Sequence, residues 1–190
     1  MSGGACGILT PMNYYGAKDL ARSFRTVRGN TITIASEIGE EHYGFRATPD
    51  TRTVAQVLIH IANVPKLQLQ LQAVERVTTL EGFDFMAFLG PVLADEQKPY
   101  TKAQILERLK TDGESFAQWL ETLPDSFLGE IVTMRAGMEP AEKTRFEMIL
   151  GVKEHEMHHR AQLMQIERML GITPHLTRQM QARFAAQTAR

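Results

Sequence analysis

Three helix starts of the same kind constrain the fold of this chain more than any other feature. Each is a capping box, in which a threonine hydroxyl accepts from the backbone N–H three residues later and the Gln or Glu there accepts from the threonine N–H. The pairs are Thr53 with Gln56, Thr101 with Gln104, and Thr144 with Glu147. Because each precedes an apolar run at helical spacing, the sequence predicts helices over about residues 54–75, 102–122 and 145–170.

A fourth long helix is predicted ahead of these three, over residues 18–36. Its apolar stripe at helical spacing consists of Leu20, Phe24, Val27, Thr31, Ile34 and Ile38. Four long helices with weak strand signals indicate an all-α protein, a four-helix bundle. After Pro174 the sequence predicts an additional short C-terminal helix, amphipathic, with Leu176, Met180 and Phe184 on one face.

The length of 190 residues suits one domain with one sizeable core. We therefore expect a flexible N-terminal segment over residues 1–15 and a single helical bundle domain over residues 16–190. The connection over residues 78–100 is long for a bundle, so it is expected to fold over part of it. Its phenylalanines, Phe83, Phe85 and Phe88, are expected in the core rather than against a substrate.

The composition argues against several classes of partner. The formal net charge of −1 gives no basic field for nucleic acid. No apolar run reaches the roughly 20 residues that a membrane helix needs. The first ten residues lack the basic and apolar regions of a secretory signal, and Cys6, the single cysteine, excludes an internal disulfide. The expected location is the cytoplasm.

Three histidines predict a metal site. His155 and His159 are four residues apart, so they share one helix face, and that face is apolar. His60 falls on the predicted inward seam of the second helix, which reads Val57, His60, Val64, Leu67, Leu71 and Val74. Burying three imidazoles without partners would be costly, and a divalent transition metal removes that cost. Three protein ligands also leave a coordination position open.

The sequence is also compatible with other interpretations of these histidines and their neighbours. Buried histidines are often satisfied by backbone carbonyls, in which case no metal is needed. Glu156 follows His155 as in the His-Glu-x-x-His motif, but the helix has no matching third-ligand extension, which argues against a metalloprotease. His158 points away from the pair, and His42 and His175 near helix ends are expected to be exposed. Two roles are compatible with Gln162: a hydrogen bond to a ligand histidine, or a position at the surface or the edge of the core.

Two segments resemble the DinB/YfiT-like family: residues 38–62, which contain His60, and the pattern His-x-x-x-His-Arg-x-Gln formed by His155, His159, Arg160 and Gln162. The resemblance covers about residues 20–171. It implies a four-helix bundle whose three matching histidines bind one divalent metal, commonly nickel or zinc. Nitrogen-only ligation by itself also suits iron and copper. Ala161 departs from the family, which often has Gly there. Pro65, one turn past His60, is also unusual and is expected to kink the second helix.

The resemblance further implies thiol-dependent transferases and isomerases among the relatives, and homodimers. We therefore expect a metal-dependent enzyme acting on a small-molecule substrate, with a low-molecular-weight thiol as a candidate and S-transfer as the reaction. The alternatives are a metal-dependent hydrolase, a non-catalytic bundle with a structural metal, and a metal-free helical protein that acts by association. No residue is assigned as catalytic from the sequence.

Overall fold

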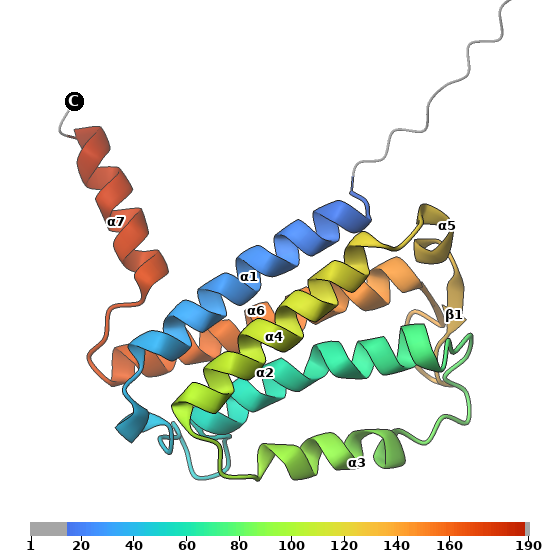
Figure 1. Cartoon of the computed structure of the whole chain (residues 1–190), viewed down its shortest axis with the longest axis horizontal. Helices are drawn as coiled ribbons and strands as arrows, with labels where there is room; N and C mark the ends of the chain where they lie inside the picture. Colours follow the sequence, from blue (N-terminus) through green and yellow to red (C-terminus); the bar gives the residue numbers. More distant parts are fainter. Residues whose placement is uncertain (1–14, 189–190) are drawn as a thin grey trace, which may run out of the picture.

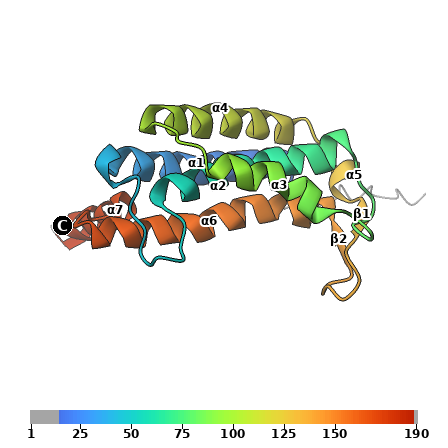
Figure 2. The same ribbon diagram turned by 90° about the horizontal axis from the view of Figure 1, so that it is seen from below.

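The computed structural model describes residues 15–188, in which four long helices lie side by side (Figure 1, Figure 2). They are α1 (Ala17–Glu37), α2 (Val54–Leu69), α4 (Lys102–Glu121) and α6 (Arg145–Met169). Helices α1 and α2 each pack against both α4 and α6, so these first two helices lie diagonally across the bundle. The predicted all-α bundle is therefore confirmed.

All three predicted capping boxes form. In the first, the Thr53 hydroxyl accepts from the N–H of Gln56 at 3.2 Å, and Gln56 Oε1 accepts from the N–H of Thr53 at 2.9 Å. The boxes at Thr101 and Thr144 have the same two bonds. The six stripe residues predicted for the first helix are all buried. Local capping and one apolar face thus fix where the long helices begin and which way they face.

The long connection contains a helix that the sequence did not predict, α3 (Phe85–Glu96). The Asp84 side chain caps it by accepting from the N–H of Ala87 at 2.9 Å. Gly90 and Pro91 lie inside it, which is why the segment lacked a helical signal. Helix α3 packs against α2, so the connection does fold over the bundle. Its phenylalanines pack on one another and on a small third core with Leu71, Leu80, Val132 and Met134.

The end of the second helix differs from the prediction. After Leu69 the chain forms a single π-helical turn, η2 (Gln70–Val74), closed by a 2.9 Å bond from the N–H of Glu75 to the carbonyl of Gln70. A π turn adds one residue to the helical turn and shifts the side chains after it. Val74, predicted on the inward seam, is consequently 70% exposed. Leu71, earlier in the same turn, remains buried.

Short elements close the ends of the bundle. The 3-10 helix η1 (Glu40–His42) follows α1, and α5 (Asp125–Leu128) follows α4. Strands β1 (Ile131–Thr133) and β2 (Glu142–Thr144) pair antiparallel, with Ile131 opposite Thr144. Neither the strands nor these two short helices were predicted, because each is too short to carry a periodic signal.

The predicted C-terminal helix is α7 (His175–Thr188), which projects from the bundle (Figure 1). Met180 and Phe184 on its apolar face are 56% and 60% exposed. The prediction that His175 is exposed is wrong, because α7 begins against α1 and buries it, with Nε2 3.1 Å from Asn30 Oδ1. His42, also predicted to be exposed, has a side chain that is 42% exposed.

Among the helices of residues 15–188, none is long and apolar enough to cross a membrane. The N-terminal segment predicted to be flexible, residues 1–15, lies outside the described part of the chain except for its last residue. Cys6 also lies outside it.

Candidate metal centre

The structure brings the three predicted ligands together. His60 comes from α2, and His155 and His159 come from successive turns of α6. The Nε2 atom of His155 lies 3.0 Å from that of His60 and 3.1 Å from that of His159. One ligand atom from each ring can be chosen so that all three lie within 4.8 Å of one another. A tetrahedral site with metal–nitrogen bonds of about 2.0–2.1 Å would hold its nitrogens about 3.3 Å apart, which is close to the two distances from His155 Nε2.

For His60 and His159, the other ring nitrogen determines which atom faces the centre. His60 Nδ1 is 2.6 Å from Glu96 Oε1, and His159 Nδ1 is 2.8 Å from Gln162 Oε1. Both partners are acceptors, so each Nδ1 carries the proton and each Nε2 presents a lone pair. His155 Nε2 can donate one N–H to only one of these two lone pairs, which leaves the other without a donor. Hydrogen bonding therefore cannot satisfy the three converging nitrogens, whereas a metal ion can.

The electrostatics also suit a metal. Burial lowers the pKa of His155 to about 4, with contributions from the neighbouring histidines and from Arg52. Burial lowers the pKa of His159 as well, although its hydrogen bond with Gln162 opposes the shift. These two rings are therefore neutral at neutral pH, which is the form that binds a metal. Within residues 15–188, this is the one group of His, Cys, Asp and Glu side chains clustered closely enough to hold a metal ion.

Glu96 completes the surroundings of His60, and the sequence analysis missed it. Its side chain is 2% exposed. One oxygen holds His60 Nδ1, and the other accepts from Arg52 Nε at 2.8 Å. A carboxylate on the far nitrogen of a ligand histidine orients the ring and raises its basicity. No sequence signal could have found it, because Glu96 ends the unpredicted helix α3.

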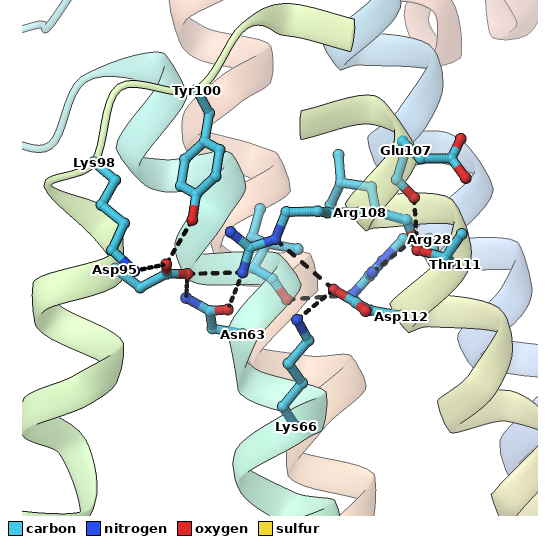
Figure 3. A network of polar contacts seen from close by, with 12 residues as sticks. Arg28, Asn63, Lys66, Asp95, Lys98, Tyr100, Glu107, Arg108, Thr111 and Asp112 are labelled. Atoms are coloured by element: carbon cyan, nitrogen blue, oxygen red, sulfur yellow. Dashed lines mark hydrogen bonds and ion pairs between the residues drawn. The ribbon is translucent and has the colours of Figure 1, made fainter. Parts of the chain in front are cut away.

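A polar network fixes this end of α3 against α2 and α4 (Figure 3). Asp95, next to Glu96, accepts from Arg108 at 2.7 Å, from Tyr100 at 2.6 Å and from Asn63 at 3.1 Å. Burial alone would raise the pKa of Asp95, but these bonds and one from a lysine outweigh it and hold the pKa well below its usual range. Asn63 lies less than one turn after His60, so the network also fixes Glu96 relative to that histidine.

A buried ion pair connects all four long helices. Arg28 of α1 and Glu156 of α6 have side chains that are 4% and 2% exposed. Arg28 Nε donates to both carboxylate oxygens of Glu156, at 2.9 and 3.1 Å, and Nη2 donates to one of them at 2.9 Å. Nη1 donates to the carbonyl of Leu109 in α4, and Nη2 to the carbonyl of Ile61 in α2. Ile61 follows His60, and Glu156 follows His155, so this pair holds the two ligand-bearing helices in register.

The contacts of Arg28 account for a proline inside α2 and a glycine in α4. Pro65 lies inside α2, which continues past it to Leu69. Because proline has no N–H, the carbonyl of Ile61 lacks its helical donor, and Arg28 supplies one at 3.2 Å. Gly113 of α4 faces the same arginine, and a Cβ there would lie 3.0 Å from Arg28 Cγ and Nη1. The guanidinium thus occupies space that a larger residue in α4 would fill.

Three other residues singled out from the sequence, Glu156, Gln162 and His158, also make specific contacts. Glu156, which suggested a metalloprotease motif, is engaged by Arg28 and is not available as a base. Gln162 contacts a ligand histidine, which was one of the two places predicted for it. His158 is exposed and bonds to Gln162 at 3.1 Å, so it stays outside the three-histidine cluster.

A pocket of about 380 Å³ opens beside His159. It lies between α6 and the segment that joins η1 to α2. Its lining residues are Ala47, Asp50, Thr51, Arg52, Val57, His159, Gln162, Gln165, Ile166 and Met169. This size is within the range of small-molecule sites, and the lining mixes apolar walls with a few polar groups.

Fold and site together define a helical bundle whose interior presents three histidines able to hold a metal ion. The family model of the DinB superfamily matches residues 23–163, which include all three histidines, and the chain belongs to this superfamily. A crystal structure of a DinB-like protein, YjoA, from Bacillus subtilis is similar, with a TM-score of 0.58 and 18% identity over 81% of this chain and 93% of that one. The comparison with curated proteins found no significant match.

Proposed function

We propose that this protein is a metal-dependent enzyme in which His60, His155 and His159 bind one divalent transition metal. The convergence of their Nε2 atoms beside an open pocket carries the proposal. Nitrogen ligands suit zinc and nickel, our first candidates, and also iron. Three protein ligands leave at least one position for a substrate atom, which is the pattern of catalytic rather than structural zinc.

The reaction that we propose is transfer of a low-molecular-weight thiol to an electrophile. A bound metal would supply one property, a lowered pKa for a thiol placed in the pocket. The thiol loses its proton to solvent, the sulfur bonds to an electrophilic carbon, and the bond from that carbon to its leaving group breaks. Neutral imidazoles favour this chemistry because they leave the positive charge of a metal uncompensated, which attracts an anionic sulfur.

The chain's own residues would orient this reaction. Glu96 and Gln162 fix the tautomers of His60 and His159, so their lone pairs stay directed to the centre. Hydrolysis is the alternative reaction, because a bound metal would lower the pKa of a water as well as that of a thiol. Glu96 and Glu156, the carboxylates next to the histidines in space or in sequence, are both paired with arginines, so neither is free to act as a base. This favours the thiol reaction, because a free thiol has a pKa of about 8.5 against about 15.7 for water.

Metal content and turnover test the proposal together. Elemental analysis should find about one equivalent of metal in the wild type and in His158→Ala, which removes an exposed histidine outside the cluster. His60→Ala and His159→Ala should lose it. Turnover of electrophiles with a panel of thiols should then follow metal content. Equal metal in all four proteins would overturn the site, and full metal without turnover of any thiol would leave the structural role as the better account.

A further inference from the structure

The pocket contains one cation placed to bind an anion beside the metal centre. Arg52, which lines the pocket, uses its Nε on the buried carboxylate of Glu96. Its side chain is 39% exposed. Among residues 15–188, no hydrogen-bond partner is seen for its two terminal nitrogens, Nη1 and Nη2. Guanidinium groups present paired N–H donors that match the two oxygens of a carboxylate.

The same pocket has an apolar wall. Val57 of α2 is buried at its base, and Ile166 lies about two turns along α6 from His159. Met169, at the end of α6, is 51% exposed and lines the pocket mouth. A methionine there can pack against aliphatic chains of varied shape. One end of the pocket therefore reaches the histidine cluster at His159, one side is apolar, and Arg52 supplies a positive charge.

We propose that the substrate bound in this pocket is a small carboxylic acid, with its carboxylate on Arg52, its aliphatic part against Val57, Ile166 and Met169, and its reactive group at the metal centre. The inference rests on the proposed function and specifies its substrate class. Glu96 links the anion site to the metal centre, because its carboxylate contacts both Arg52 and His60. The buried carboxylate of Glu96 therefore sets the distance between the anion site and the metal centre.

Charge favours a carboxylate over a phosphate. A divalent metal and Arg52 bring three positive charges, and Glu96 and Asp50 bring two negative ones, so a thiolate with one carboxylate leaves the site at a net charge of about −1. A phosphate monoester would bring a further negative charge into a pocket that also contains the carboxylate of Asp50. Like charges in a confined site cost binding energy, so the dianion is disfavoured.

Mercapto acids of increasing chain length and their methyl esters test this inference on the cobalt(II)-loaded protein. Binding is read from the sulfur-to-cobalt absorption band, and cobalt content is measured first for each variant. In the wild type, one chain length should bind as the acid about tenfold or more tightly than as the ester, the size of one charge-assisted hydrogen bond. Compared at equal cobalt content, Arg52→Gln should weaken the acid to the level of the ester. Arg52→Lys should keep part of the preference.

Arg46→Gln is the matched control, because Arg46 lies in the same segment but does not line the pocket. It should keep the full preference. Equal affinity of acid and ester at every length, or a preference that survives in Arg52→Gln, would overturn the inference. If no thiol alters the cobalt band, the thiol function fails. Hexanoate and hexanamide, compared by calorimetry, then still test the anion site, which requires that hexanoate bind more tightly and that Arg52→Gln abolish the difference.

Discussion

The buried Arg28–Glu156 pair gives the sharpest prediction about stability. Replacing Arg28 by methionine keeps much of its volume but leaves the Glu156 carboxylate at 2% exposure without a cation. Breaking a buried pair from one side typically costs about 3–5 kcal/mol. Arg28→Met should therefore lower the free energy of unfolding by that amount, measured by urea denaturation followed by far-ultraviolet circular dichroism.

Replacing both Arg28 and Glu156 separates the contribution of the ion pair from that of the hydrogen bond to the Ile61 carbonyl. In Arg28→Met with Glu156→Leu no charge is left buried, so the loss from the ion pair should largely disappear. The carbonyl of Ile61 still lacks a donor, because Pro65 has no N–H, and a buried acceptor without a partner costs about 1–3 kcal/mol. The double variant should retain a deficit of that size.

Pro65→Ala in the double variant should then recover most of the deficit, since the alanine introduced there supplies an N–H to the carbonyl of Ile61. In the wild type the same change should gain less, because the Ile61 carbonyl already accepts from Arg28. Arg22→Met is the control on the same helix. Arg22 pairs with Asp19 at 2.6 Å on the surface, with the arginine 77% exposed, so its loss should cost less than about 1 kcal/mol. A loss of that small size for Arg28→Met, or no recovery by Pro65→Ala, would refute the reasoning.

Three further predictions concern the surroundings of these groups. Glu96→Gln should weaken metal binding roughly 10- to 100-fold with His60 intact, measured by competition with a chelator, because the ring loses its carboxylate partner. Gly113→Ala should destabilise the fold by about 1–3 kcal/mol, seen as a lower urea midpoint, because the added methyl overpacks against Arg28. Burial, with Glu37 nearby, raises the pKa of Glu167 to about 7. Its contribution to stability should therefore be full below about pH 4 and fall by roughly 1–3 kcal/mol as the pH rises through 7, and Glu167→Gln should remove this dependence. Urea midpoints that stay flat across this range in the wild type would contradict the last prediction.

The long helices could be predicted because their signals are local. A capping box lies within four residues, and an apolar stripe lies within one helix, so neither depends on the rest of the chain. Helix α3 could not be predicted in this way, since its interior contains Gly90 and Pro91 and tertiary contacts hold it. Val74 was misplaced for a related reason, because a π turn changes the side-chain period without leaving a clear pattern in the sequence.

The three clustered histidines were predictable in part, from their spacing and from an inward helix face. Glu96 was not, because it reaches the site from α3, whose helix left no signal in the sequence. Arg52 lies only eight residues before His60, but its contact with the site is through Glu96 and so depends on the same helix. The buried ion pair did leave a signal. Arg28 falls on the inward stripe four residues after Phe24, and Glu156 falls four residues after Val152. Opposite charges on the inward stripes of two helices indicate a buried pair, because an unpaired charge in a core is too costly.

In the proposed function, metal binding and substrate recognition fall to different parts of the chain. The histidines come from α2 and α6, whose register is set by the Arg28–Glu156 pair in the core. The substrate pocket is lined on one side by the segment before α2, which contributes Asp50 and Arg52. Loops carry specificity on a rigid scaffold because they tolerate change. Substitutions at Asp50 should therefore change which thiol or electrophile is accepted while leaving metal content unchanged. Substitutions at Arg52 should change both the accepted substrate and the metal content, since Arg52, unlike Asp50, is joined through Glu96 to His60.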